Sequence, residues 1–180
     1  GIIKAGTSLD KITEKEELLL RAVARTHLAT GTPISTHTEA GTMALEQINI
    51  LTSEGVDPTH ITIGHLDRKL EWPYHRRIAE RGVFMGYDQI SKEKYQPDRA
   101  RIDFIGRLIA EGFGGQLLLS GDFARQSYWP SYGKGGGPGL TFILFRFVPW
   151  LRLEGVTESA VVDMLVKNPA RALAMNGSGG

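Results

Sequence analysis

Five ionisable side chains lie at or just after short β-rich runs of the sequence, and their types suit metal-assisted hydrolysis. They are Lys4, His37, His65, Asp88 and Asp122. Imidazole nitrogens and carboxylate oxygens suit zinc, manganese or iron(II) and leave positions open for water. Two such ions can hold a hydroxide between them and polarise a carbonyl or phosphoryl oxygen. The set therefore indicates a hydrolytic metal centre if the fold brings the five runs together.

Each of these residues also has a purely structural interpretation. A single His after a strand is usually a hydrogen-bonded loop residue, and Lys4 could extend its ammonium group into solvent. Asp88 and Asp122 could cap the helices or turns that follow them. Two His, a Lys and an Asp at the ends of separate strands favour a common site instead. Three other His fall on helix faces or at a strand start, and we interpret them as structural: His27, His60 and His75.

The elements that must position these residues form a repeating pattern of a β-rich run, a polar loop and an amphipathic helix. Thr13 and Glu16 have the spacing of a capping box, which predicts a helix start. That helix carries Leu19, Leu20, Val23 and His27 on one face and ends before Gly31. Further helices are predicted from Thr42 to near Gly55 and over 72–81, 98–111, 139–153 and 158–166, with a terminal turn at 168–169.

Five β/α units of about thirty residues each predict an α/β fold with parallel strands and helical crossovers. Two architectures fit this pattern. One is a five-stranded, doubly wound sheet of the flavodoxin type, and the other is part of an eight-stranded barrel, which needs about 250 residues. In a closed barrel the strand-end side chains converge on one axis, whereas in an open sheet they form a row. No glycine fingerprint follows the first strand, so a flavodoxin-like binding domain has little support.

The amino-acid composition argues against several kinds of partner and metal site. The 180 residues include 21 Lys and Arg against 20 Asp and Glu, so charge gives no reason to expect nucleic acid or an anionic membrane as a partner. The absence of Cys excludes disulfides and thiolate metal ligands. The most apolar stretch, 139–151, contains Arg146 and Pro149 and is too short to cross a bilayer. We expect a cytoplasmic protein that acts on a small-molecule substrate, and a homodimer is left as an open alternative.

Four segments resemble the phosphotriesterase family of the amidohydrolase superfamily. They are IIKAGTS at 2–8, ISTHTEAGT at 34–42, IGHLD at 63–67 and NPAR at 168–171. The resemblance runs in order from Gly1 to about Ala174. It implies a (β/α)8 TIM barrel, of which residues 1–175 would supply strands four to eight, followed by a flexible tail at 176–180.

The resemblance also implies two divalent ions, zinc before manganese, cobalt or iron. Lys4 would be the carboxylated lysine that bridges both ions, His37 and His65 would bind one ion, and Asp122 would bind the other. Asp122 would also act as the general base that takes the proton from a bridging hydroxide as it attacks. The implied substrates are lactones, carboxylic esters and organophosphate triesters.

The sequence departs from the family pattern in two ways. It has no counterpart of the first-strand His-x-His pair that binds the second metal, because the resemblance begins at the fourth strand. We therefore expect a fragment that needs an N-terminal barrel half as its partner and is inactive alone; an inactive half-barrel or assembly piece is the alternative. Second, Gln89 replaces a typical His of organophosphate-cleaving members, and Arg68 stands where a carboxylate is expected, which favours an ester or lactone.

The predicted substrate-binding residues come from three loops. Aromatic rings in the loop at 123–138 could pack an acyl or alkoxy group, and Arg125 could orient a polar end of the substrate. A surface loop without a binding role is the alternative. The full set is Asp67, Arg68, Asp88, Gln89, Arg125, Tyr128 and Trp129.

Overall fold

The chain forms one parallel five-stranded sheet in the order β1-β2-β3-β4-β5. This computed structural model describes residues 1–131 and 137–175, so the predicted tail at 176–180 lies outside the described residues. The strands are β1 (Ile3–Thr7), β2 (Ile34–Thr38), β3 (Ile61–Gly64), β4 (Phe84–Tyr87) and β5 (Leu117–Leu119). The sequential order is that of neighbouring strands in a barrel and excludes the 2-1-3-4-5 order of the flavodoxin type.

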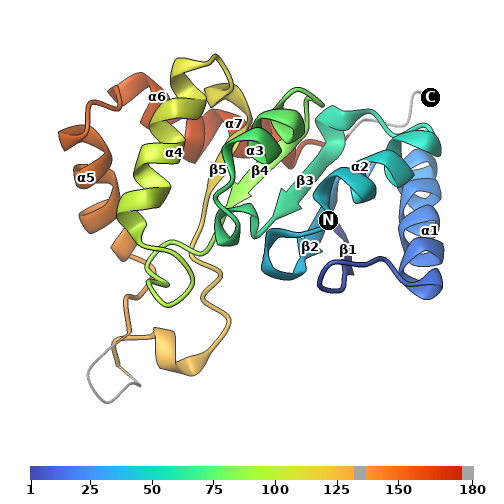
Figure 1. The fold of residues 1–180 in the computed structure, drawn as a ribbon, viewed down its shortest axis with the longest axis horizontal. Helices are drawn as coiled ribbons and strands as arrows, with labels where there is room; N and C mark the ends of the chain where they lie inside the picture. The colour runs from blue at the N-terminus through green and yellow to red at the C-terminus, as the bar shows by residue number, and fades with distance from the viewer. Residues whose placement is uncertain (132–136, 176–180) are drawn as a thin grey trace.

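Helices connect the strands and cover the sheet (Figure 1). α1 packs beside β1 and β2 at one end of the sheet, while α4, α5 and α6 lie at the other end. The helices are α1 (Glu14–Thr30), α2 (Ala44–Ser53), α3 (Trp72–Ala79), α4 (Asp98–Ala110), α5 (Val148–Leu153), α6 (Glu158–Val162) and α7 (Asn168–Ala172).

The predicted capping box opens α1. Thr13 Oγ1 accepts from the backbone N–H of Glu16, and Glu16 Oε2 accepts from that of Thr13. The predicted face is correct for Leu20, Val23 and His27, which are buried, but wrong for Leu19, which is 48% exposed. Successive helix residues are about 100° apart, so Leu19 lies beside the buried stripe and not within it.

Several element boundaries differ from the prediction. β1 continues through Thr7, because its last three residues pair with Thr36 to Thr38 of β2. Lys4 is therefore the second residue of its strand and not the last. α2 begins at Ala44, because Met43 adopts a left-handed φ of 62°. The predicted turn at 168–169 is instead helical: α7 continues directly from a π-helical turn at Asp163–Lys167, and Pro169 lies in the first turn of α7.

The core lies between the sheet and its helices. Apolar strand residues such as Ile34, Ile63 and Met85 are fully buried, together with Ile48 of α2 and Ile105 of α4. All five strands pair in parallel and therefore run in one direction. The carboxyl ends of all five strands consequently lie along one edge of the sheet.

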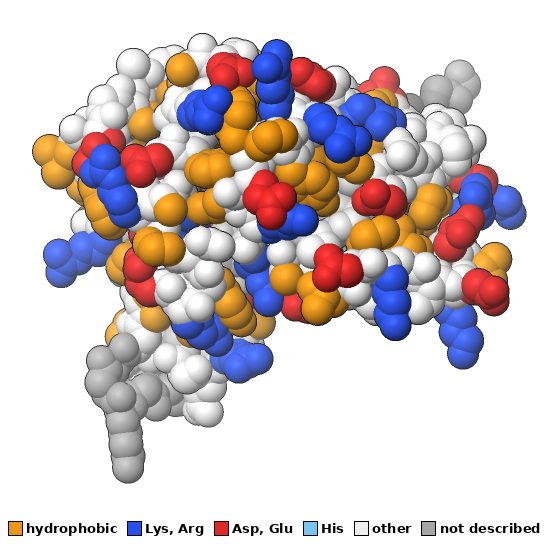
Figure 2. Space-filling model, viewed as in Figure 1, with side chains coloured by type: hydrophobic (Ala, Val, Ile, Leu, Met, Phe, Trp, Pro, Cys, Tyr) orange, Lys and Arg blue, Asp and Glu red, His pale blue; other side chains and the backbone are white. Residues whose placement is uncertain are grey.

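The surface carries no long run of one charge on the face seen in Figure 2, where Lys and Arg alternate with Asp and Glu among apolar side chains. This distribution agrees with the near-zero net charge of the chain. No helix within residues 1–131 and 137–175 is long and apolar enough to cross a membrane.

Candidate active site

His65 stands at the carboxyl end of β3 and is held by Asp88 from the next strand. Its ring Nδ1 lies 2.7 Å from Asp88 Oδ1, and its backbone N–H donates to the same carboxylate at 3.1 Å. Two glycines make room for this carboxylate: a Cβ at Gly64 or at Gly86 would come within 3.2 Å of Asp88 Oδ2. Because Nδ1 donates to Asp88, Nε2 of His65 is the ring nitrogen left to act as a ligand.

The environment of His65 raises its pKa. Partial burial acts to lower this pKa, but the hydrogen bond and the negative charge of Asp88 outweigh burial. Asp122 acts in the same direction, and the charge of Lys4 opposes it. Lys4 and Asp122, at the two edge strands of the sheet, are thus both close enough to influence His65.

His37, the fourth residue of β2, lies against His65. The two rings meet edge to face with their centres 4.6 Å apart. Gly6 of β1 allows this position of His37, because a Cβ at Gly6 would come within 3.0 Å of His37 Cβ. His37 Nε2 also lies 3.2 Å from Glu39 Oε2, and Glu39 accepts a hydrogen bond from Arg68. Two of the predicted metal ligands are therefore side by side.

Lys4 is exposed and points across to β2. Its Nζ donates to Ser35 Oγ at 3.2 Å and to the backbone carbonyl of Thr36 at 3.4 Å. The register places Gly6, and not Lys4, opposite His37. The charge of Lys4 acts on His65, so Lys4 lies near that imidazole, but its hydrogen bonds among the described residues go to Ser35 and Thr36.

Asp122 is tied to the other ligands through Gln89. The amide Nε2 of Gln89 donates to Asp122 Oδ2 at 3.1 Å and to Asp88 Oδ1 at 3.2 Å. The Gln89 side chain therefore bridges Asp122 to the His65–Asp88 pair. It was predicted as a substrate-binding residue, and its hydrogen bonds place it between the two carboxylates.

Lys92 is a site residue that the sequence interpretation missed. Its Nζ lies 2.7 Å from Asp122 Oδ2 and 2.9 Å from the Asp122 backbone carbonyl. Partial burial acts to raise the pKa of Asp122, but the hydrogen bonds from Lys92 and Gln89 and the charge of Lys92 outweigh it, so the net shift is downward. Lys92 belongs to the polar run SKEK, which looks like a solvated loop; its position four residues after Asp88 was the available signal.

Asp67 lies in a buried ionic network beneath the site. It was expected to bind substrate, but it is completely buried and forms an ion pair of 2.8 Å with the equally buried Arg101 of α4. Its two oxygens also accept the backbone N–H groups of Asp88 and Gln89. Burial, together with the negative charge of Asp88, raises the pKa of Asp67 to about 6 despite Arg101. Asp67 therefore holds the loop that carries Asp88 and Gln89.

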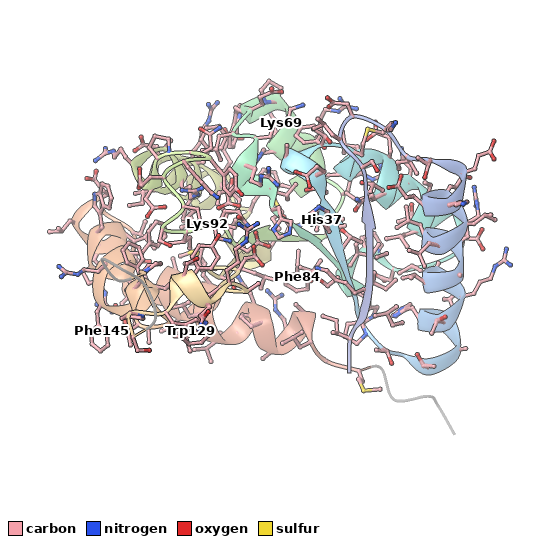
Figure 3. The ribbon with its side chains drawn as sticks, turned by 90° about the horizontal axis from the view of Figure 1, so that it is seen from below. His37, Lys69, Phe84, Lys92, Trp129 and Phe145 are labelled. Carbon is pink, nitrogen blue, oxygen red and sulfur yellow. The ribbon has the colours of Figure 1, made fainter. Side chains whose placement is uncertain are left out.

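The loop after β5 contributes Tyr128 to a cavity of about 290 Å³. The rest of the cavity lining is formed by Ser91, Lys92, Glu93, Lys94 and Pro138. Arg125 is exposed, and Trp129 lies away from His37 in Figure 3, on the side of Phe145. Of the three residues predicted from this loop, Tyr128 alone lines that cavity. A larger cavity of about 490 Å³ lies at the opposite ends of the strands, away from His37 and His65, and its lining includes His60, Gln116 and Arg171.

The three histidines that we interpreted as structural make their contacts outside the candidate site. His27 Nδ1 lies 2.7 Å from the Thr32 carbonyl, and its ring packs against His60. His75 is fully buried, with Nδ1 2.7 Å from the hydroxyl of Tyr87 and Nε2 2.7 Å from the Lys69 carbonyl.

The donor set fits part of a metal site. Two imidazoles lie in contact, and the amide of Gln89 links the Asp122 carboxylate to Asp88, the hydrogen-bond partner of His65. Within residues 1–131 and 137–175, however, no group of three His, Cys, Asp or Glu side chains is close enough to hold an ion by itself.

Comparison with known proteins decides the family. The sequence model of the phosphotriesterase family matches residues 1–173. The chain belongs to the phosphotriesterase family. The predicted resemblance is thereby confirmed, and the five parallel strands in sequential order agree with the predicted partial TIM barrel.

Two curated relatives and one solved structure illustrate the relationship. A phospho-furanose lactonase of Mycoplasmopsis synoviae is 39% identical over 98% of this chain and 51% of its own length. The phosphotriesterase homology protein of Escherichia coli is 38% identical over 95% of this chain and 58% of its own length. The crystal structure of a Listeria monocytogenes lactonase superposes with a TM-score of 0.93 at 46% identity, over 97% of this chain and 54% of that one. The chain thus spans about half the length of the relatives it matches.

Proposed function

We propose that this chain supplies the carboxyl-terminal part of a binuclear metal-dependent hydrolase that opens lactones and carboxylic esters. The observation that supports this most is the grouping of His37, His65 and Asp122 at the ends of three separate strands of one sheet. The two imidazoles are in contact, and the amide of Gln89 joins the Asp122 carboxylate to Asp88, which holds His65. The relatives named as lactonases support the same reaction class.

In this proposal His37, His65, Asp122 and a carboxylated Lys4 would hold the divalent ions, zinc before manganese, cobalt or iron. When bound, such ions supply a Lewis acid for the substrate carbonyl and an activated water. Asp88 orients the ring of His65 through Nδ1 and leaves Nε2 as the ligand atom.

Asp122 would accept the proton released when water attacks the carbonyl. Lys92 and Gln89 lower the pKa of this carboxyl group, so it is ionised at neutral pH and ready to accept a proton. The side chain is 42% exposed, which leaves it accessible from the solvent side.

The substrate would lie between the metal ligands and the cavity that Tyr128 lines. Glu93 also lines this cavity and accepts the backbone N–H of Asp98, whereas Lys94, which unlike Lys92 is not committed to Asp122, offers the cavity an exposed positive charge. A lactone that carries a phosphate or another anionic group fits this charge, in agreement with the phospho-furanose lactonase relatives. Gln89 and Arg68 stand where organophosphate-cleaving members differ, so an organophosphate triester would be a poorer substrate.

The test compares the 180-residue chain alone with the same chain co-expressed with the amino-terminal half of the Listeria monocytogenes lactonase. Metal content is measured by mass spectrometry, and hydrolysis is measured with a phosphorylated furanose lactone, an unphosphorylated lactone and an aryl dialkyl phosphate. The proposal expects bound divalent metal and lactone hydrolysis in the co-expressed form. Neither metal nor hydrolysis in either form would contradict it and favour an inactive assembly piece.

A further inference from the structure

We infer that Lys92 is a positioning residue for the reaction, because its ammonium group clamps one oxygen and the backbone of Asp122. This inference rests on the proposed function of Asp122 as ligand and proton acceptor. Figure 3 shows Lys92 near the middle of the molecule, on the same side as His37.

The ammonium group of Lys92 has an acceptor for each of its three protons. These are Asp122 Oδ2 at 2.7 Å, the Asp122 carbonyl at 2.9 Å and Gln89 Oε1 at 3.0 Å. The ring of Tyr128 lies 4.9 Å from the same nitrogen. A buried ammonium group is costly unless it is paired and fully hydrogen-bonded, and Lys92, with a side chain 4% exposed, meets both conditions.

The backbone of the Lys92 loop is anchored as well. The N–H of Lys92 donates to the Gln89 carbonyl at 3.0 Å, and its carbonyl accepts from Arg101 at 3.5 Å. Arg101 is fixed in turn by Asp67 and Asp98, and all three are buried. Lys92 therefore reaches Asp122 from a rigid base, as a positioning group requires.

The contacts fix Asp122 asymmetrically. Oδ2 accepts from both Lys92 and Gln89, whereas Oδ1 accepts no hydrogen bond from the residues that the structure describes. Asp122 also has a φ of 44°, in the left-handed region that a non-glycine residue rarely adopts. The bond from Lys92 to the Asp122 carbonyl stabilises that backbone conformation. One carboxylate oxygen is thus held in place, and the other is left for an ion or a proton.

Lys94 is the natural comparison for Lys92. Both residues line the same cavity and both are lysines of one loop, but Lys94 is exposed and has no hydrogen bond to Asp122 among the described contacts. Because the three donors of Lys92 are already used, Lys92 has none left for a substrate. Its effect must pass through Asp122.

The first test needs neither metal nor activity. The melting temperature of the metal-free 180-residue chain is measured for Lys92→Met, for Asp122→Asn and for the double variant. The inference expects strong coupling: the double variant melts no lower than the less stable single variant, since either change breaks the same pair. The control pair, Lys94→Met with Asp122→Asn, should be additive. Additive effects for Lys92 and Asp122 would overturn the inference.

The second test separates positioning from a merely structural role. In the co-expressed active form, Lys92→Met should lower kcat about tenfold to a hundredfold while KM changes little. Lys92→Arg retains the charge and should recover part of kcat. A raised KM at unchanged kcat would assign Lys92 to substrate binding and overturn the inference. If the unaltered chain has no activity, the proposed function fails, while the melting experiment still decides the Lys92–Asp122 pairing.

Discussion

His65 and Asp88 are joined by a hydrogen bond of 2.7 Å between Nδ1 and Oδ1, although they follow different strands of the sheet. The backbone N–H of His65 donates to the same carboxylate, so both the ring and the main chain are oriented by one side chain. A His ligand that is fixed in this way presents a single nitrogen in a single direction.

Asp88→Asn should therefore weaken metal binding without unfolding the chain. The amide fills the same space but is a weaker acceptor for the Nδ1 proton, so His65 loses both orientation and basicity. We expect metal affinity in the co-expressed form to fall about tenfold to a hundredfold. Titration with manganese measures this, with the exposed Asp103→Asn as the control. Equal affinities of the Asp88 and Asp103 variants would contradict the role of Asp88.

Asp122→Asn should abolish turnover, because it removes both a ligand and the proton acceptor. We expect kcat for lactone hydrolysis to fall by about a hundredfold or more. The measurement is a steady-state assay of the co-expressed form with added metal. Near-wild-type activity would remove Asp122 from the mechanism.

Arg101→Met should destabilise the fold strongly. It leaves the buried carboxylates of Asp67 and Asp98 without their cation, and breaking a buried pair costs about 3–5 kcal/mol. The matched control is Arg99→Met on the same helix, where the ion pairs are half exposed and screened by solvent, so the loss should be much smaller. Urea unfolding measures both free energies. Similar losses for the two variants would show that the buried network contributes little.

His75 should make the chain sensitive to acid. Burial lowers the pKa of His75 to about 4, although the Lys69 carbonyl opposes this. The unfolded chain, with a His pKa of about 6.5, binds the proton first, so stability is lost as pH falls from about 6.5 towards 4. The loss at pH 5 is about 2 kcal/mol from this residue.

Unfolding in urea at pH 7.5, 6 and 5 measures this effect against His75→Gln. The variant should be less stable at pH 7.5, because it loses the short contacts to Tyr87 and Lys69. Its stability should nevertheless change less between pH 7.5 and 5 than that of the unaltered chain. Parallel pH profiles would assign the acid sensitivity to other groups.

Local features of the fold were predictable because their determinants are close together in sequence. Thr13 and Glu16 are one helical turn apart, so the capping box requires no tertiary contact. The alternation of β-rich runs and helices also predicted five parallel strands. The predicted strand ends were less accurate. Lys4 was predicted to end the first strand, whereas pairing with β2 extends β1 to Thr7.

The candidate site likewise has features that the sequence predicts and features that depend on tertiary contacts. His37, His65 and Asp122 lie at or just beyond the carboxyl ends of separate strands, and parallel pairing brings such positions to one edge, so their grouping could be expected from the sequence. The neighbours Asp67 and Arg68 could not be distinguished in this way. Asp67 is buried because Arg101, on a distant helix, supplies its counter-charge, whereas Arg68 pairs with the half-exposed Glu39.

The sequence by itself determined the family resemblance, the alternation of strands and helices and the residue types at the strand ends, since these depend on local pattern; the order of the strands in the sheet came from the tertiary structure. The tertiary structure alone decided which oxygen of Asp122 is held, and that Lys92 is the residue that holds it. Thirty residues separate the two in the chain, and a polar loop lysine is indistinguishable from a solvated one until folding removes water from around it.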